Sequence, residues 1–274
     1  MILIRTCKGH EELEACVDMQ VEVWGYDASD LIPRKAFLVG LKIGGQVLGA
    51  FDTELPGASP EGDAGSMIGF AMSLPGVKTG KDTPDGIPRP YLHSHMLAVK
   101  DGYRNQGLGA KLKLEQRREA LSRGIRRMEW TFDPLEIKNA FLNIHRLGAV
   151  IRSYRPDFYG VSSSRLQGGL PTDRLLAEWE LASPRVEAKL NGPPAAERTA
   201  AAHTIEERIL VPAAIYQWKA SNSSRNRALA VQMENRKKFQ EAFSQGLAVV
   251  GFSLDAEGNG IFELAPLSQP EQVF

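Results

Sequence analysis

The stretch that decides the fold reads Leu97-Ala98-Val99-Lys100-Asp101-Gly102-Tyr103-Arg104-Asn105-Gln106-Gly107-Leu108-Gly109-Ala110. It leaves an apolar segment predicted as a strand over 91–99 and enters a segment predicted as a helix over 106–123. Glycines at 107 and 109 let backbone amides approach a ligand without obstruction by a Cβ atom. The start of the helix adds N–H groups without intrahelical partners and a partial positive charge. Such a turn suits a pyrophosphate, although an ordinary tight turn before a helix has the same pattern.

Two common nucleotide-binding motifs do not fit this loop. A Rossmann fingerprint requires G-x-G-x-x-G, and the third position after Gly109 is Leu112. A Walker A loop requires Gly-Lys-Ser/Thr at the end of a longer glycine spacing, which this sequence does not have here. What remains is the pattern R-x-x-G-x-G/A after an apolar strand that ends in L-A-V.

The surrounding sequence alternates segments with the apolar spacing of strands and of helices. Residues 74–90 hold four Pro and three Gly and are expected to form a long surface loop. The runs 36–43 and 47–52, joined by Gly44-Gly45-Gln46, predict a β-hairpin. Alternation of this kind predicts an α/β fold built on a sheet. Strands are predicted over 2–5, 66–73, 91–99, 127–132, 149–154 and 173–181, and helices over 9–24, 106–123 and 137–147.

The loop and the order of elements together resemble the GCN5-related N-acetyltransferase (GNAT) superfamily. Arg104, Gly107 and Gly109 match the family's R-x-x-G-x-G/A signature. The segment 137–149, IKNAFLNIHRLGA, looks like the family's second motif, and the order of elements fits from residue 1 to about 160. Agreement across several levels is better evidence than any one motif. The resemblance implies a GNAT-like α/β (α+β) fold, in which helices flank a mixed central sheet.

The same resemblance implies that acetyl-CoA (coenzyme A) is the co-substrate and lies where two neighbouring parallel strands splay apart. The pantetheine would run along the backbone of residues 97–99, and the pyrophosphate would meet the amides of 105–110. Asn139 and Asn143 either hydrogen-bond the pantetheine amides or face solvent. The residues expected to bind the cofactor are Leu97, Ala98, Val99, Arg104, Asn105, Gln106, Gly107, Leu108, Gly109, Ala110, Asn139 and Asn143.

A cluster of basic residues follows the loop, interrupted by Glu115 and Glu119. Most of these side chains are interpreted as a solvated helix face, and one or two would meet the 3′-phosphate of CoA. The seven basic residues are Lys111, Lys113, Arg117, Arg118, Arg123, Arg126 and Arg127.

Amide formation from a thioester requires a neutral amine, stabilisation of a tetrahedral oxyanion and a proton for the leaving thiolate. Strand alternation places His93 and His95 on one face with Leu97 and Val99, unless a bulge near the thioester breaks that register. By resemblance, His93 matches the position at which some family members carry a catalytic Glu. Because imidazole titrates near neutral pH, His93 and His95 are the candidate catalytic residues. A buried histidine that bonds a backbone carbonyl is the alternative for each.

The acid that protonates the leaving thiolate is harder to assign. The resemblance places a tyrosine where this chain has Ile144. Asp133, directly after a predicted strand, either binds a cationic acceptor or caps the following turn. Water and the absence of any transfer are alternatives to the three side-chain candidates for the acid, which are Tyr154, Tyr159 and His145.

Composition limits the class of protein. The 274 residues carry 33 Lys+Arg and 33 Asp+Glu, and a net charge of zero gives no global field for nucleic acid or anionic lipid. The longest apolar runs, 36–41 and 247–252, have strand length, so no membrane span is expected. Residues 1–5 lack the features of a secretory signal, and a cytoplasmic location is expected. Cys7 and Cys16 are interpreted as buried thiols rather than as a disulfide framework.

Three segments are predicted along the chain. Residues 1–183 would form the GNAT-like acyl-CoA-binding domain. Residues 184–204 are rich in Ala, Pro and Glu, contain little that could pack, and are predicted to be a linker. Residues 205–274 would form a βαββ extension packed on the main domain, where it either covers a sheet edge or helps to make a homodimer.

These observations predict an acetyl-CoA-dependent N-acetyltransferase that acts on the amine of a small-molecule or amino-acid-like acceptor. Two alternatives stay open: a non-catalytic acyl-CoA-binding or sensing protein, and an acyltransferase with another donor and an oxygen acceptor. No metal is expected, because His93-Ser94-His95 has no spaced Cys or carboxylate to complete a ligand set. No nucleic-acid or membrane partner is expected.

Overall fold

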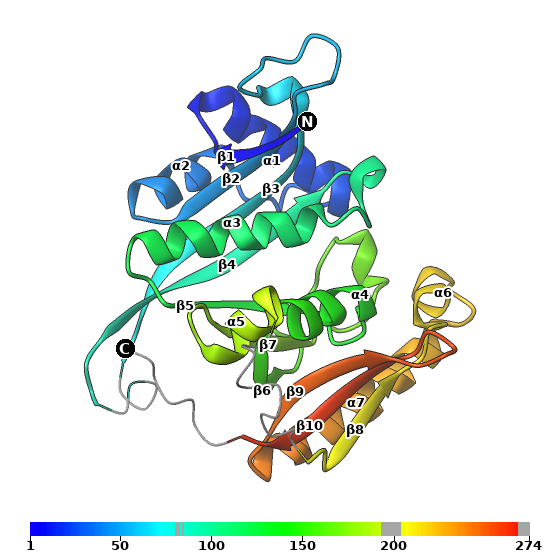
Figure 1. The fold of residues 1–274 in the computed structure, drawn as a ribbon. Helices are drawn as coiled ribbons and strands as arrows, with labels where there is room; N and C mark the ends of the chain where they lie inside the picture. Colours follow the sequence, from blue (N-terminus) through cyan, green and yellow to red (C-terminus); the bar gives the residue numbers. More distant parts are fainter. Residues whose placement is uncertain (80–82, 84, 193–203, 268–274) are drawn as a thin grey trace. The chain divides into compact units, whose positions relative to one another are not determined.

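The computed structural model describes residues 1–79, 83, 85–192 and 204–267. The chain divides into two compact units. Figure 1 shows their helices and strands, coloured by residue number. Unit 1 comprises Met1–Glu129 with Ser163–Arg165, and unit 2 comprises Trp130–Ser162 with Leu166–Phe274. Both units combine strands and helices, as the sequence predicts.

The strands of unit 1 follow one another as antiparallel neighbours. β1 (Ile2–Thr6) pairs with β2 (Gln46–Asp52), β2 with β3 (Met67–Lys78), and β3 with β4 (Arg89–Val99). β5 (Arg127–Phe132) begins in this unit, and its first residues run parallel to β4. The sheet is therefore mixed, as predicted.

Both ends of the region 74–90, predicted as a surface loop, belong to strands: residues 74–78 to β3 and residues 89–90 to β4. β3 continues to Lys78 and β4 begins at Arg89, and these two residues lie opposite each other. Pro75 and Pro90 are strand residues within this hairpin. Proline is compatible with a strand where its missing N–H is not needed for the ladder, so a proline count alone overestimated the loop.

Residues 36–43, predicted as one arm of a β-hairpin, lie mostly in helix α2 (Arg34–Lys42). Phe37 and Gly40 are its buried residues, and a spacing of three fits a helix rather than a strand. Gly44 has φ 93°, and the amide of Gly45 donates to Gly40 O at 2.8 Å. The Gly-Gly pair therefore ends a helix and does not form a hairpin turn.

Helices pack on both faces of the unit 1 sheet. α1 (Gly9–Trp24) and α2 cover one face, where Phe37 packs in a core that includes Phe70 of β3. α3 (Leu108–Ser122) covers the other face, where Leu112 belongs to a second core. Alternate residues of β3 contribute to the two cores, because successive strand side chains point to opposite faces.

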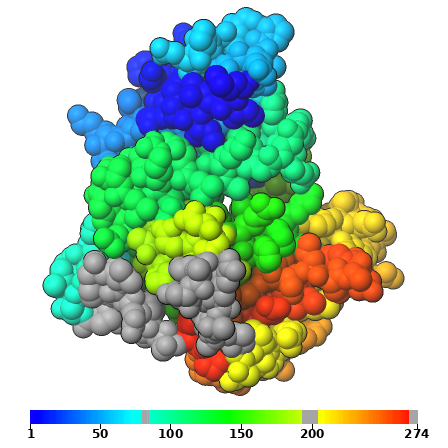
Figure 2. All heavy atoms as spheres, in the orientation of Figure 1, coloured from blue at the N-terminus to red at the C-terminus, as the bar shows by residue number. Residues whose placement is uncertain are grey.

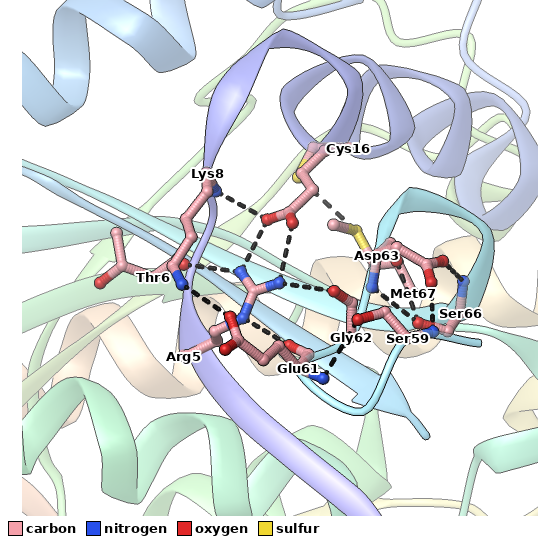
Figure 3. A network of polar contacts seen from close by, with 11 residues as sticks. Arg5, Thr6, Lys8, Cys16, Ser59, Glu61, Gly62, Asp63, Ser66 and Met67 are labelled. Carbon is pink, nitrogen blue, oxygen red and sulfur yellow. Dashed lines mark hydrogen bonds and ion pairs between the residues drawn. The ribbon is translucent and has the colours of Figure 1, made fainter. Parts of the chain in front are cut away.

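A polar network joins β1, α1 and the connection before β3 (Figure 3). Arg5 donates two hydrogen bonds of 2.8 Å to the carboxylate of Glu12. It also donates to Glu61 O at 2.8 Å and to Gly62 O at 3.0 Å. Its guanidinium carbon lies 4.1 Å from the centroid of the Phe51 ring. One cation thus fixes three segments, and these contacts give the network a structural role.

The strands of unit 2 lie in the order β5-β7-β6-β9-β10-β8. β6 (Val150–Arg155) pairs antiparallel with β7 (Arg174–Glu180) and with β9 (Leu247–Leu254). β10 (Gly260–Pro266) pairs antiparallel with β9 and with β8 (Glu207–Val211). The strands of the C-terminal extension therefore continue the sheet that β6 and β7 begin.

The helices of unit 2 follow the predicted order with two additions, one of them in the segment predicted as a linker. α4 (Ile137–Ala140) continues into a π-helical turn (Phe141–Arg146) before β6. α6 (Ile215–Ala220) and α7 (Arg225–Ser244) lie between β8 and β9, where the predicted βαββ extension has a single helix. Within the described ranges, no helix is both long enough and apolar enough to cross a membrane.

The segment predicted as a linker begins with a helix. α5 (Pro184–Asn191) has Ser183 at its start, whose hydroxyl accepts from the amide of Val186 at 3.3 Å. Val186 is buried, so this part of the segment does pack. Residues 193–203 lie outside the described part of the chain. The two compact units divide after Glu129, and the predicted domain and linker boundaries stay predictions.

Candidate functional site

The loop between β4 and α3 has the backbone that its glycine pattern predicts. Gly107 is the N-cap of α3 with φ 79°, and Asn105 has φ 60°. A Cβ at Gly107 would meet nothing within 4 Å, so the backbone conformation rather than crowding favours glycine there. Because the N-cap is a glycine, no N-cap side chain accepts from the amides of the first turn. Residues 105–107 are exposed, and α3 lies at the surface in Figure 2 (green), so this helix start can be reached by an anion.

The signature arginine folds back on its own loop. Arg104 Nε donates to Val99 O at 3.1 Å, and its guanidinium pairs with Asp101 at 2.7 Å. Gln106 Nε2 donates to Gly102 O at 2.9 Å. These contacts hold the end of β4 close to the start of α3. Direct binding of a cofactor by Arg104 or Gln106 stays a prediction.

β4 contains a β-bulge at His95. Ser94 lies opposite Ser73 of β3, and the next opposed pair is Met96 with Met72. Two steps along β4 therefore match one step along β3, which makes His95 the additional residue. Simple alternation along the sequence of β4 does not reveal this bulge.

The bulge changes which side chains share a face with the histidines. Leu97 and Val99 pack on the core beneath α3. His93 lies opposite Leu74, which packs on the core beneath α1 and α2, and directly opposed residues point to the same side. The predicted common face of His93 with Leu97 and Val99 is therefore wrong. His93 and His95 do stay together, with ring centroids 6.2 Å apart.

The surroundings of the histidines keep them uncharged. Burial lowers the pKa of both imidazoles, and that of His93 falls to about 4. For His93, desolvation is the main cause, His95 adds to it, and Glu129 acts in the opposite direction. The Lys78 cation also lowers the pKa of His93. His93 is thus neutral at pH 7, which is the protonation state that a general base requires.

The carboxylate beside His93 is already occupied. Glu129 lies next to His93 on the parallel strand β5 and is buried. It pairs with Lys78 at 2.8 Å and with Arg127 at 2.7 Å. Lys78 Nζ also lies 4.8 Å from the centroid of the Tyr91 ring. Glu129 is therefore already paired with two cations.

A second polar group lies on the other side of β4, beneath α3. Lys113 Nζ donates to Ser94 Oγ at 2.8 Å, and Ser94 Oγ donates to Gln116 Oε1 at 3.1 Å. Lys113 is 4% exposed, and burial lowers its pKa well below the usual range. Its interpretation as part of a solvated face is therefore wrong. The available signal was spacing, because Lys113 and Gln116 lie three residues apart on the stripe that α3 buries.

The other basic residues of this segment fit the predicted surface face better. Lys111 is exposed on the first turn of α3. Three arginines form ion pairs within unit 1: Arg118 with Glu115 at 2.5 Å, Arg123 with Glu119 at 2.7 Å, and Arg127 with Glu129 at 2.7 Å.

Unit 2 carries the two asparagines predicted to bind the cofactor. Asn139 is exposed on α4, whereas Asn143 is buried in the π-helical turn. Ile144, at the position of the family's tyrosine, is fully buried. An aliphatic side chain supplies no proton, so this chain departs from the family pattern here. The cofactor contacts of the two asparagines stay predictions.

Tyr154, one candidate for the acid, is tied to a buried ion pair. Its hydroxyl donates to Asp173 at 2.5 Å, and Asp173 accepts from Arg236 at 2.9 and 2.6 Å. Burial is the main cause that raises the pKa of Tyr154 above its ordinary value, and the bond to Asp173 adds to it. These contacts explain Tyr154 as a structural residue of unit 2.

The other two candidates for the acid are more accessible. The hydroxyl of Tyr159 lies 2.9 Å from Thr131 Oγ1, and Tyr159 is 45% exposed. His145 is exposed, its Nδ1 lies 3.2 Å from Phe252 O, and its ring stacks on Phe141. A role in proton transfer stays a prediction for both.

Asp133 caps a turn and holds a lysine. Its carboxylate accepts from the amide of Leu135 at 2.8 Å and pairs with Lys219 at 2.8 Å. Lys219 also pairs with Glu136 at 2.8 Å. Of the two roles predicted for Asp133, the turn cap is present, and the cation beside it belongs to the chain itself. Across the described residues, no group of three or more His, Cys, Asp or Glu is placed to hold a metal ion.

Solved structures with a similar fold include several acetyltransferases. Arabidopsis thaliana NAA60 in complex with acetyl-CoA has a TM-score of 0.51 at 15% identity, covering 65% of this chain and 98% of that chain. The ribosomal-protein-S18-alanine N-acetyltransferase from Escherichia coli has a TM-score of 0.47 at 15% identity, covering 67% and 96%. A GNAT family acetyltransferase from Elizabethkingia anophelis with acetyl-CoA bound has a TM-score of 0.43 at 15% identity, covering 65% and 97%. Neither a protein-family model nor a curated protein sequence matches the chain.

At 15% identity these similarities concern the fold. The match covers 98% of the Arabidopsis chain but 65% of this one, as expected for a GNAT-like core with an extension. In this chain helices flank a mixed sheet, and the glycine loop lies before α3. The predicted fold class is confirmed: the chain has the GNAT fold, with additional sequence beyond it.

Proposed function

We propose that the protein is an acetyl-CoA-dependent N-acetyltransferase whose acceptor is the amine of a small molecule or an amino-acid-like compound. The fold supports this proposal, because a solved structure with a similar fold holds acetyl-CoA. The observation that carries it is the loop before α3, with a left-handed glycine N-cap and exposed residues 105–107. Amides at such a helix start bind phosphate groups, so the pyrophosphate of CoA would be held there.

The donor would extend from this loop along the end of β4. Residues 97–99 directly follow the bulge and lead into the loop, so their backbone is the proposed contact of the pantetheine. Lys111 is exposed on the first turn of α3 and is the proposed partner of the 3′-phosphate.

The histidines are the proposed bases. The acceptor nitrogen attacks the thioester carbonyl carbon and gives its proton to an imidazole, and the carbon–sulfur bond then breaks. His95 lies at the bulge, two residues before Leu97, and is the nearer of the two to the proposed thioester position. His93 has a pKa of about 4, which makes it the weaker base.

The leaving thiolate must also gain a proton. Ile144 replaces the tyrosine that the family resemblance leads one to expect, and the Tyr154 hydroxyl is bonded to Asp173. In this proposal the proton therefore comes from water, and no side chain is assigned as the acid.

A thermal-shift titration with acetyl-CoA and CoA tests the donor site. Ligand at about 100 times its Kd stabilises a protein by about 2.7 kcal/mol, and a chain of this size should gain several degrees in Tm. The variant Gly107→Glu places a carboxylate at the proposed pyrophosphate position and should show no gain. The proposal is wrong if the wild type shows no shift at millimolar ligand.

Two control variants separate charge from backbone strain. Gly107→Ala has the same left-handed strain without the negative charge, and nothing lies within 4 Å of its Cβ. Gly102→Glu adds the same charge outside residues 105–110, also with nothing within 4 Å of the Cβ. Both controls should keep a ligand-dependent rise in Tm, which Gly107→Glu should lose.

Release of CoA thiol from acetyl-CoA with a panel of amines tests the transfer step. Thiol release that depends on an amine supports the acetyltransferase. Donor binding without thiol release for any amine would favour the non-catalytic acyl-CoA-binding alternative. A cytoplasmic location and a homodimer are also part of this proposal, and light scattering of the purified protein tests the dimer.

A further inference from the structure

A strip of buried polar side chains lies beneath α3, in a face that is otherwise apolar. Ser73 Oγ donates to Gln46 Oε1 at 2.8 Å, and Gln46 Nε2 donates to Gln116 O at 2.9 Å. Ser94, opposite Ser73, accepts from Lys113 and donates to Gln116 Oε1. These five residues are called the polar strip below. The buried core beside it consists of Leu48, Ala50, Ile68, Ala71, Leu108 and Leu112.

Keeping this strip buried costs free energy. Lys113 is 4% exposed and Gln116 is 0% exposed. Within the described part of the chain, Gln116 Nε2 has no hydrogen-bond partner, and such an atom costs about 1–3 kcal/mol. Burial of an amine adds a further cost, which losing its proton reduces. Aliphatic side chains would extend the neighbouring core at lower cost, so stability alone does not explain the strip.

The position of the strip suggests what it does. Ser94 is the residue of β4 directly before His95. Its opposed residue on β3 is Ser73, and the register shifts between Ser73 and Met72. The additional residue of a bulge lacks an opposed partner, so its conformation depends on contacts from outside the ladder. Lys113 and Gln116 converge on the Ser94 hydroxyl and provide such contacts.

We propose that Lys113 and Gln116 are positioning residues that fix the bulge through Ser94 and so orient His95 and His93 for proton transfer. The inference rests on the proposed acyltransferase function. α3 begins directly after Gly107, so one helix joins the proposed pyrophosphate loop to the bulge. The donor and the histidines would therefore share one rigid frame.

Threonine and valine at position 94 provide the sharpest test. Both are β-branched and suit a strand, and threonine has a hydroxyl where valine has a methyl group. Ser94→Thr should keep kcat within about threefold of wild type, whereas Ser94→Val should lose about tenfold or more, with KM for acetyl-CoA nearly unchanged in both. This split is expected because the hydroxyl acts on the histidines and not on the donor.

A second variant covers the case in which Ser94→Val does not fold. Lys113→Met removes the donor to Ser94 and keeps a long unbranched side chain, so it should lower kcat as Ser94→Val does. Leu112→Val is the matched control, because Leu112 is buried on α3 beside Lys113 in the aliphatic core. It should lower Tm and leave kcat unchanged at a temperature where all variants are folded.

Imidazole NMR signals measure the orientation of His93 and His95 without acetyl-CoA. The signals should coincide in wild type and Ser94→Thr and should move in Ser94→Val and Lys113→Met. Identical histidine signals in the threonine and valine variants would overturn the positioning role. An inactive wild type with histidine signals that differ between these two variants would instead count against the proposed function alone.

Discussion

Two buried lysines of this chain have pKa values that move in opposite directions. Lys113 in unit 1 is 4% exposed and Lys219 in unit 2 is 5% exposed. Burial lowers the pKa of both, but for Lys219 the attraction of Asp133 and Glu136 outweighs it and the pKa is raised. Lys113 donates to the hydroxyl of Ser94, and desolvation lowers its pKa. One lysine is thus stabilised as a cation, and the other is driven toward the neutral amine.

The difference separates a structural cluster from a functional candidate. Lys219 forms ion pairs with the carboxylates of Asp133 and Glu136, and these three residues are called the Lys219 cluster. Asp133 also caps the turn after β5. The polar strip with Lys113 lies at the bulge that carries His95, and its Gln116 Nε2 has no hydrogen-bond partner among the residues that the structure describes. Buried groups that are held at a cost in free energy cluster at functional sites, so the second cluster is where an active site is expected.

The largest expected change is a loss of stability when the ion pairs of Lys219 are removed. Lys219→Met leaves Asp133 and Glu136 without their buried partner and should lower the free energy of unfolding by about 3–5 kcal/mol. Urea denaturation measures the change. Lys238→Met is the control, because Lys238 forms an exposed pair with Glu234, and its loss should be too small to resolve. Equal losses in both variants would mean that the Lys219 pairs are as weak as a surface pair.

Removal of the histidines should have the next largest effect. His93→Ala or His95→Ala should lower kcat about 100-fold or more, with the affinity for CoA nearly unchanged, because a general base acts in the transfer step. His10→Ala, exposed on α1, is the control. Steady-state kinetics with the best amine of the panel measures the effect. Unchanged turnover in both single variants and in the double variant would exclude histidine from the mechanism.

The pH dependence of stability distinguishes the two lysines. In the folded state the pKa of Lys113 lies below that of a free lysine, so the unfolded chain binds more protons between the two values. Stability should therefore rise with pH over that interval, by at most about 1.4 kcal/mol per pH unit, and Lys113→Met should remove the rise. The pKa of Lys219 is raised in the folded state, so its stabilisation is fully present below the pKa of free lysine and is lost as the pH rises through the folded-state pKa. Urea unfolding at stepped pH values gives the slopes, and identical slopes in wild type and Lys113→Met would contradict a neutral Lys113.

The smallest expected effect is a shift in the pH dependence of kcat/KM. A base must be unprotonated, and burial lowers the pKa of His93 to about 4 and lowers that of His95 as well. The fall of kcat/KM on the acidic side should therefore lie below the pKa of a free histidine, near 6.5. A fall centred near 6.5 or above would point to another base or to a more exposed histidine.

The glycine loop was predictable because its requirements are local. A glycine is favoured at position 107 by its own φ of 79°, and the sequence on either side has strand and helix spacing. The α2 segment was not predictable in the same way, because its apolar run fits a strand or a helix. The spacing of Phe37 and Gly40 against the sheet decided between them.

The bulge and the polar strip depend on contacts that are distant in sequence. The register shift at His95 follows from pairing with β3, and alternation within β4 alone cannot reveal it. The run of basic residues around Lys113 predicts a face that is mostly solvated and does not single out Lys113. Its burial follows from the stripe that α3 turns toward the sheet. The cofactor and catalytic residues stay predictions.

The pairing of β9 with β6 has a consequence for any attempt to shorten the protein. Ile151 of β6 lies opposite Val249 of β9, so a fragment that ends before residue 205 leaves the N–H and C=O groups of β6 open to another chain. In the full chain the last strand in the order is β8, which has the charged Arg208 exposed. The C-terminal strands therefore protect β6 from pairing with another chain. A fragment that ends before residue 205 should be far less soluble than the full chain.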